Sequence, residues 1–177
     1  MKLYHIDRSG HMKSGDTISL VKDFSTNKMK VKEYYKNGLS SHGLWYYTSD
    51  ARDKNFFLDA IFEYERLLHY PKKLSRYQAF FCFDAHGVIE FINMKYLEDI
   101  FYKIYEIEVD EKRVEKHNMS LVRGWSHQSI IKYARMYWED LPDAYDKEAK
   151  VIYEYLVKLP VIIGKEVSLK EIKKQIN

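Results

Sequence analysis

Residues 151–157 read VIYEYLV, and the fold class of the chain is best argued from this stretch. All of its residues except Glu154 are β-branched, aromatic or aliphatic, which predicts a buried strand at 151–157. Alternation along a strand puts Glu154 on the same face as Ile152 and Leu156. A buried carboxylate needs a partner. The stretch therefore allows two interpretations: a partnered Glu154 with a function, or a solvated Glu154 on the exposed face of a sheet edge.

Working outward from this strand, several further segments have the periodicity of regular structure. The sequence predicts strands at 1–7, 17–22, 77–83, 103–109 and 161–163, and helices at 53–69, at 127–138 and after Ser168. It also predicts a helix or turn near 93–101, a long polar connection at 23–43 and a solvated charged connection at 110–117. Strands and helices do not alternate regularly. We therefore expect a single α+β domain covering residues 1–177 rather than a doubly wound parallel sheet.

The composition is rich in aromatic residues and poor in turn residues, because 16 Tyr, 9 Phe and 3 Trp accompany only 7 Gly and 3 Pro. A chain of 177 residues favours one domain with a core of its own. Part of the aromatic excess is expected in that core, namely Phe57, Tyr64, Phe80 and Phe83. The positions where a nucleotide ring could stack instead are Tyr34, Tyr35, Tyr46, Tyr47, Tyr77 and Trp138.

Charge, cysteine content and hydropathy restrict the class of protein. Lys+Arg is 29 and Asp+Glu is 26, and this net charge of +3 argues against nucleic acid as a partner without excluding it. The one cysteine, Cys82, lies in the apolar run 79–83 and is expected to be buried and inert. No apolar run approaches the length of a membrane span, and no basic start leads into one. A cytoplasmic protein with no membrane partner is therefore expected, and exposed aromatic residues would allow a homodimer.

Motifs for several common cofactors are missing from the sequence. It contains no G-x-G-x-x-G, phosphate loop, G-x-S-x-G, H-E-x-x-H or C-x-x-C. Their absence argues against a Rossmann or P-loop nucleotide site, and the dispersed histidines argue against a metal site.

Three positions remain as candidates for chemistry. His5 lies inside the first strand, where it is either a structural histidine or projects into a cleft. Arg76 precedes the aromatic segment 77–81 and is either a surface residue or a bidentate ligand for a phosphate or carboxylate. Glu154 is the third, with the two interpretations given above.

The motifs around these positions, taken in order, resemble those of the ADP-ribosyltransferase superfamily. The resemblance is closest to a group of small uncharacterised bacterial proteins within it. The chain has LYHIDR and two glycines within 3–15, P-x-x-x-SRYQ-x-FF at 71–81, YW at 137–138 and EYLV at 154–157. These motifs are spread over most of the chain.

The resemblance implies two small packed β-sheets that form a cleft with flanking helices, and NAD as the substrate. When the bond between nicotinamide and ribose breaks, positive charge develops that a carboxylate can stabilise, and Glu154 matches that catalytic position. The resemblance assigns His5 to the adenosine-side ribose and places Ser75 and Arg76 against NAD, with Arg76 at the pyrophosphate. The aromatic residues implied to stack on nicotinamide or to line the cleft are Tyr77, Phe81, Tyr46, Tyr47 and Trp138.

One position departs from the pattern of superfamily members that modify arginine. Those superfamily members have Gln or Glu two residues before the catalytic glutamate. At the position that this resemblance matches, the present chain has Ile152. Modification of arginine is therefore disfavoured, and the acceptor of ADP-ribose stays open. The alternative function is a non-catalytic module on the same fold that binds a nucleotide or another protein.

Overall fold

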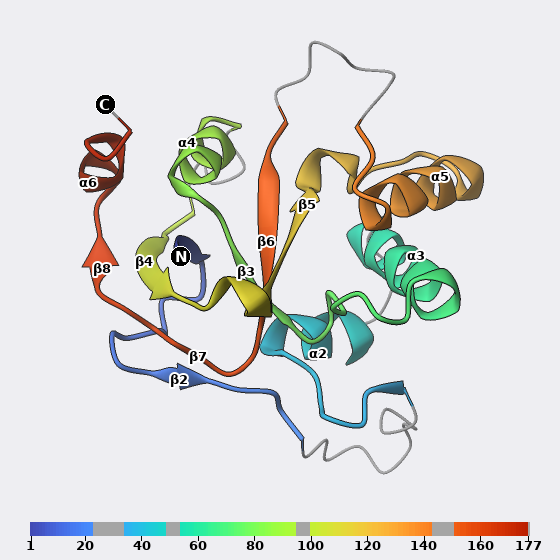
Figure 1. Cartoon of the computed structure of the whole chain (residues 1–177), viewed down its shortest axis with the longest axis horizontal. Helices are drawn as coiled ribbons and strands as arrows, with labels where there is room; N and C mark the ends of the chain where they lie inside the picture. The colour runs from blue at the N-terminus through green and yellow to red at the C-terminus, as the bar shows by residue number, and fades with distance from the viewer. Residues whose placement is uncertain (23–33, 49–53, 95–99, 143–150, 177) are drawn as a thin grey trace.

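Figure 1 shows the computed structural model, which describes residues 1–22, 34–48, 54–94, 100–142 and 151–176. These residues form a mixed α+β structure of small antiparallel sheets and helices, which confirms the expected class. The strands are β1 (Lys2–Asp7), β2 (Thr17–Ile18), β3 (Ala79–Cys82), β4 (Lys103–Glu108), β5 (Val114–Asn118), β6 (Tyr153–Lys158), β7 (Val161–Ile162) and β8 (Glu166–Val167). The helices are α2 (Ser41–Thr48), α3 (Lys54–His69), α4 (Ala85–Asn93), α5 (His127–Trp138) and α6 (Leu169–Lys173), with 3-10 turns η1 (Glu111–Arg113) and η2 (Met119–Leu121).

Two three-stranded sheets meet at one pair of residues. The first sheet has the order β1-β4-β8 and the second has the order β3-β6-β5. Tyr4 in β1 and Phe83 just after β3 exchange both of their backbone hydrogen bonds, each 2.8 Å long. This pair brings β1 and β3 together at the junction of the sheets, while β2 and β7 form a separate two-stranded ladder.

The middle strand of the second sheet, β6, is buried on both faces. Tyr155 and Val157 belong to the same core cluster as Leu3 of the first sheet. Leu156 faces the other way and joins the cluster built around α3 and α5. Burial on both faces explains why the sequence of this strand is nearly continuously apolar, and it leaves Glu154 on the side of α3 and α5.

The helices α3 and α5 pack beside each other next to β5 and β6 (Figure 1). Their bounds agree closely with the predicted helices at 53–69 and 127–138. Ser126 begins α5 with a capping box in which its side chain and that of Ser129 bond reciprocally to backbone amides. Within the described part of the chain, no helix combines the length and the apolar character needed to cross a membrane.

Two segments predicted as connections contain regular structure instead. The described end of the 23–43 connection runs into α2. The helix or turn predicted near 93–101 falls mostly on residues 95–99, outside the described residues, and the helix α4 lies before it, with Asp84 accepting a 2.7 Å hydrogen bond from the Gly87 amide at its start. The charged segment 110–117 contains most of β5, which among the described strands pairs only with β6 and so is an edge strand. Polar residues suit a sheet edge, which is why this strand resembles a loop in the sequence.

Two aromatic residues predicted for the core lie outside it. Phe57 is 41% exposed and Tyr64 is 61% exposed, whereas Phe80 and Phe83 are buried as expected. The buried face of α3 holds carboxylates as well as apolar residues, including Asp59 at 4% exposure. A charged residue on the inner face shifts the apparent apolar stripe, so the sequence pattern pointed to the wrong face.

Cys82 in β3 is fully buried within the core cluster that joins the two sheets. Burial raises the pKa of its thiol. Because the thiolate is the reactive form, Cys82 is an inert structural cysteine in the folded protein, as predicted.

Candidate functional site

The carboxylate of Glu154 is buried, with 3% of the residue exposed. Its Oε1 accepts a 2.6 Å hydrogen bond from the Tyr137 hydroxyl and another from the Arg76 guanidinium. A buried carboxylate is tolerated only when charge and hydrogen-bond partners offset its lost hydration. Of the two interpretations of this strand, the structure therefore has the partnered carboxylate and not the solvated one.

The guanidinium of Arg76 connects three elements at this carboxylate. Its Nε donates to Asp59 of α3 at 2.9 Å, and its Nη1 donates to the Tyr137 hydroxyl of α5 at 3.1 Å and to Glu154 of β6. Its carbon Cζ also lies 5.0 Å from the centre of the Phe81 ring. Burial by itself would lower the pKa of Arg76, but the carboxylates of Glu154 and Asp59 hold it well above its usual range. Arg76 is therefore a permanently charged group that orients the Glu154 carboxylate.

Tyr137 is the second group that fixes this carboxylate. It is fully buried, and burial followed by the charge of Glu154 raises the pKa of its hydroxyl well above the usual range. The hydroxyl therefore keeps its proton and donates a hydrogen bond to Glu154. The Glu154 Oε1 atom is thus held from two directions.

His5 approaches the same region from the first sheet. Its Nδ1 lies 2.7 Å from the Phe81 carbonyl oxygen, and its ring stacks on Phe80 with centroids 4.2 Å apart. Burial lowers the pKa of His5 even though the Phe81 carbonyl raises it. A carbonyl only accepts, so the neutral ring carries its proton on Nδ1 and presents Nε2 as an acceptor.

Phe81 connects the three candidate positions, His5, Arg76 and Glu154, into one line of contacts. Its carbonyl contacts His5, its ring lies under Arg76, and Arg76 binds Glu154. The structure therefore brings together His5, Phe81, Arg76 and Glu154, which come from both sheets and from the loop before β3.

Three other predicted residues lie inside the protein rather than in this line. The Ser75 hydroxyl donates to Glu63 at 2.8 Å, which anchors the loop that carries Arg76. Tyr77 is 4% exposed and packs in a small cluster with Tyr35. Trp138 is fully buried and donates its indole N–H to the Phe62 carbonyl at 2.8 Å. These side chains support the site through the core.

His42 belongs to the same region, although the sequence pattern took it for part of a turn. It lies in α2, with its ring centre 4.6 Å from that of Phe81 and 4.5 Å from that of Tyr46. Its Nε2 is buried and has no hydrogen-bond partner among the described residues. Ser40, whose hydroxyl accepts a 3.0 Å hydrogen bond from the Gly43 amide, is the helix cap that could have revealed α2 in the sequence.

Burial keeps the His42 ring neutral. Burial lowers its pKa to about 4, the charge of Asp59 opposes this shift, and those of Arg76 and Arg8 add to it. At neutral pH the ring therefore offers one donor nitrogen and one acceptor nitrogen.

The stability of the folded state is expected to fall as the pH drops from 6.5 towards about 4. In this window the unfolded chain takes up a proton on His42 that the folded chain does not, so the free energy of unfolding decreases. The variant His42→Phe should lack this contribution, and it should gain stability relative to the wild type at about pH 5 compared with about pH 7.5. Urea denaturation at both pH values measures the effect, and an unchanged difference between the two proteins would contradict it.

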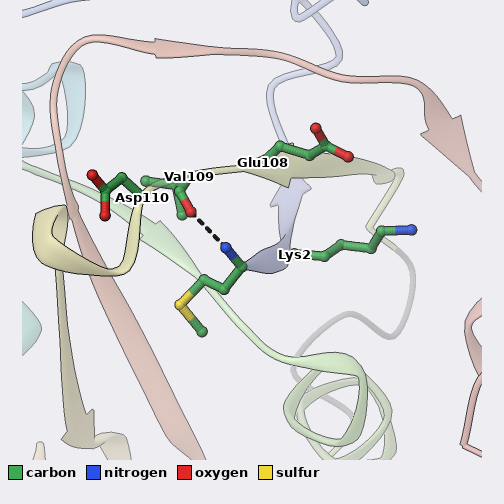
Figure 2. Close-up of a pocket in the computed structure, with 5 residues that line it drawn as sticks. Lys2, Glu108, Val109 and Asp110 are labelled. Carbon is green, nitrogen blue, oxygen red and sulfur yellow. Dashed lines mark hydrogen bonds between the residues drawn. The ribbon is translucent and has the colours of Figure 1, made fainter.

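An open pocket lies at a different place, at the start of β1 and the end of β4 (Figure 2). The α-amino group of Met1 donates to the Val109 carbonyl at 2.7 Å beside the charged residues Lys2, Glu108 and Asp110. Its lining contains no aromatic ring and none of the candidate residues. The line from His5 to Glu154 therefore remains the candidate site.

Among the residues that the structure describes, no group of three or more His, Cys, Asp or Glu side chains is placed to hold an ion. The candidate site is instead a set of aromatic rings, two neutral imidazoles and a buried carboxylate oriented by a guanidinium. This combination suits an organic ligand with a planar ring and hydroxyl groups.

Comparison with known protein families gives one match over nearly the whole chain. A family model described as “Protein of unknown function (DUF2441)” matches residues 3–169. A search of curated proteins found no match. The matched range includes every residue of the candidate site.

Proposed function

We propose a function for this chain, which belongs to the family described as “Protein of unknown function (DUF2441)”: it binds NAD, breaks the bond between nicotinamide and ribose, and transfers ADP-ribose to an acceptor. The observation that carries the proposal is the line from His5 through Phe81 and Arg76 to Glu154, where two small sheets meet. The motif resemblance assigned His5 and Glu154 to opposite ends of one ligand, and the geometry is consistent with that assignment.

The chemistry rests on the carboxylate of Glu154. When the carbon–nitrogen bond breaks, the electron pair leaves with nicotinamide and positive charge develops on the ribose. A carboxylate already oriented by Arg76 and Tyr137 stabilises that charge without reorganising. The acceptor then forms a bond to the same ribose carbon and gives up its proton to solvent.

The remaining side chains of the site bind the ligand or position the Glu154 carboxylate. The acceptor nitrogen of His5 suits a ribose hydroxyl, which donates a hydrogen bond to it. The partly exposed ring of Phe81 offers a surface on which nicotinamide can stack. Arg76, whose Nε and Nη1 already serve two carboxylates, acts as a positioning residue for Glu154 in this proposal.

Calorimetric titration of the protein with NAD, followed by chromatography of released nicotinamide, tests this function. Saturable binding together with release above the rate in buffer supports it. Binding without release would favour the alternative, a non-catalytic nucleotide-binding module. Absence of heat with NAD and with ADP-ribose would overturn both.

A further inference from the structure

The imidazole of His42 is an unused hydrogen-bonding group at the edge of the candidate site. Its Nε2 is buried without a partner in the described part of the chain. Nearly all buried polar atoms in folded proteins have a partner, so each exception needs a reason. One such reason is that the atom binds a ligand, because the ligand then supplies the hydrogen-bond partner.

The position of His42 is fixed by close backbone packing. The amide and the hydroxyl of Ser40 both donate to the Tyr77 carbonyl, at 2.8 Å and 3.1 Å. A Cβ atom on Gly43 would lie 2.0 Å from that carbonyl oxygen, so only glycine allows this approach. The first turn of α2 is therefore held against the loop that carries Arg76, and this fixes the backbone from which the His42 side chain projects.

The surroundings of His42 indicate which part of a ligand it would meet. Its ring centre lies 4.6 Å from that of Phe81, the ring on which the proposed function stacks nicotinamide. Asp59 and Arg76, which orient Glu154, act on its charge state. These neighbours place His42 on the Glu154 side of the site, whereas His5 contacts the backbone of Phe81 from the first sheet.

The low basicity of His42 indicates the chemistry of its partner. A pKa of about 4 leaves the ring uncharged at neutral pH. An uncharged imidazole gains little from a phosphate, whose preferred partners are cations. It is suited to a neutral hydrogen-bonding group such as an amide or a hydroxyl.

From these observations we infer that His42 is a further ligand-contacting residue, whose Nε2 hydrogen-bonds an uncharged amide or hydroxyl group in the nicotinamide–ribose half of NAD. The inference rests on the proposed function and adds a residue that defines which half of the ligand lies against α2. It also assigns the unpartnered nitrogen a role that a purely structural histidine would lack.

The variant His42→Phe separates this role from a structural one. Phenylalanine keeps an aromatic ring beside Phe81 and removes both ring nitrogens. We expect NAD to bind about tenfold more weakly, as for one lost hydrogen bond, while the midpoint of thermal unfolding at neutral pH stays the same or rises because no buried bond is lost. A merely structural histidine would show the opposite result, with lower thermal stability and unchanged affinity.

Further variants and shorter ligands locate the contact. His42→Gln, which retains an amide at similar reach, should recover part of the affinity, and His127→Phe, a matched change at a histidine whose ring contacts that of Phe57, should have no effect. The loss in His42→Phe should persist with nicotinamide mononucleotide and be absent with AMP. If it persists with ADP-ribose the partner is a ribose hydroxyl, and if it disappears the partner is the carboxamide.

The outcomes distinguish the inference from the proposed function. If the wild type binds neither NAD nor ADP-ribose, the proposed function is wrong and the inference falls with it. If the wild type binds NAD and His42→Phe binds equally well, only the inference is overturned. Nitrogen-15 NMR of the wild-type imidazoles gives a readout that needs no variant, because NAD should shift the Nε2 resonance of His42, and an unchanged resonance would also overturn it.

Discussion

Replacing Arg76 with alanine is expected to lower the free energy of unfolding by about 3–5 kcal/mol, because it leaves two buried carboxylates without their cation. Asp59 is 4% exposed and Glu154 is 3% exposed, so water cannot replace the lost charge. Arg76→Lys should lose less, since a lysine keeps the charge but cannot present two nitrogens to two carboxylates in a fixed plane. Denaturation in guanidinium chloride measures both variants.

The matched control for this prediction is Lys103→Ala. Lys103 pairs with Glu166 at 3.0 Å, but the two side chains are 33% and 53% exposed. Its loss should lower the free energy of unfolding far less than the loss of Arg76, because water and salt screen an exposed pair. Equal losses in Arg76→Ala and Lys103→Ala would mean that the buried network does not hold the fold together.

Replacing Glu154 with glutamine is expected to slow nicotinamide release by about 10²–10³-fold, because the amide cannot stabilise the developing positive charge. The amide keeps the shape and an acceptor oxygen for Tyr137 and Arg76. NAD affinity should therefore change by less than about threefold, which is the pattern of an interaction made mainly in the transition state. Release under saturating NAD and calorimetric affinity together measure the split.

Two further variants separate a catalytic role of Glu154 from a general loss of folding. Tyr137→Phe removes one 2.6 Å hydrogen bond to Glu154 and should slow release by about tenfold. Glu166→Gln, at an exposed carboxylate, should have no effect. If Glu154→Gln releases nicotinamide as fast as the wild type while remaining folded, Glu154 has no catalytic role.

The parts of the fold that the sequence predicted well are those in which local pattern and tertiary position agree. The helix α5 has an apolar stripe and the Ser126 cap, and both of its bounds were predictable. The strand β5 was not, because an edge strand tolerates charged residues and His117 is buried there at 1% exposure despite its polarity. A pattern method that equates charge with exposure misses such segments.

The site was predictable only where a motif marked it. Glu154 attracted attention as one charged residue in an apolar strand, but its partners lie far away in the sequence. Asp59 is 17 residues from Arg76, and Arg76 is 78 residues from Glu154. Periodicity describes neighbours within one element, so it gave no sign that Asp59 pairs with Arg76. His42 was missed because the adjacent glycine suggested a turn, whereas the glycine serves a close approach to Tyr77.

The buried cysteine allows the opening of the folded protein to be measured by chemical labelling. Cys82 is the chain's one thiol, and it lies in β3 beside the junction of the two sheets. Because Cys82 is fully buried, a thiol reagent reaches it only in molecules that have opened around β3, so the labelling rate measures opening in unmodified protein. A ligand that touches both sheets would slow that rate without any mutation, which makes the native chain its own sensor for occupants of the junction.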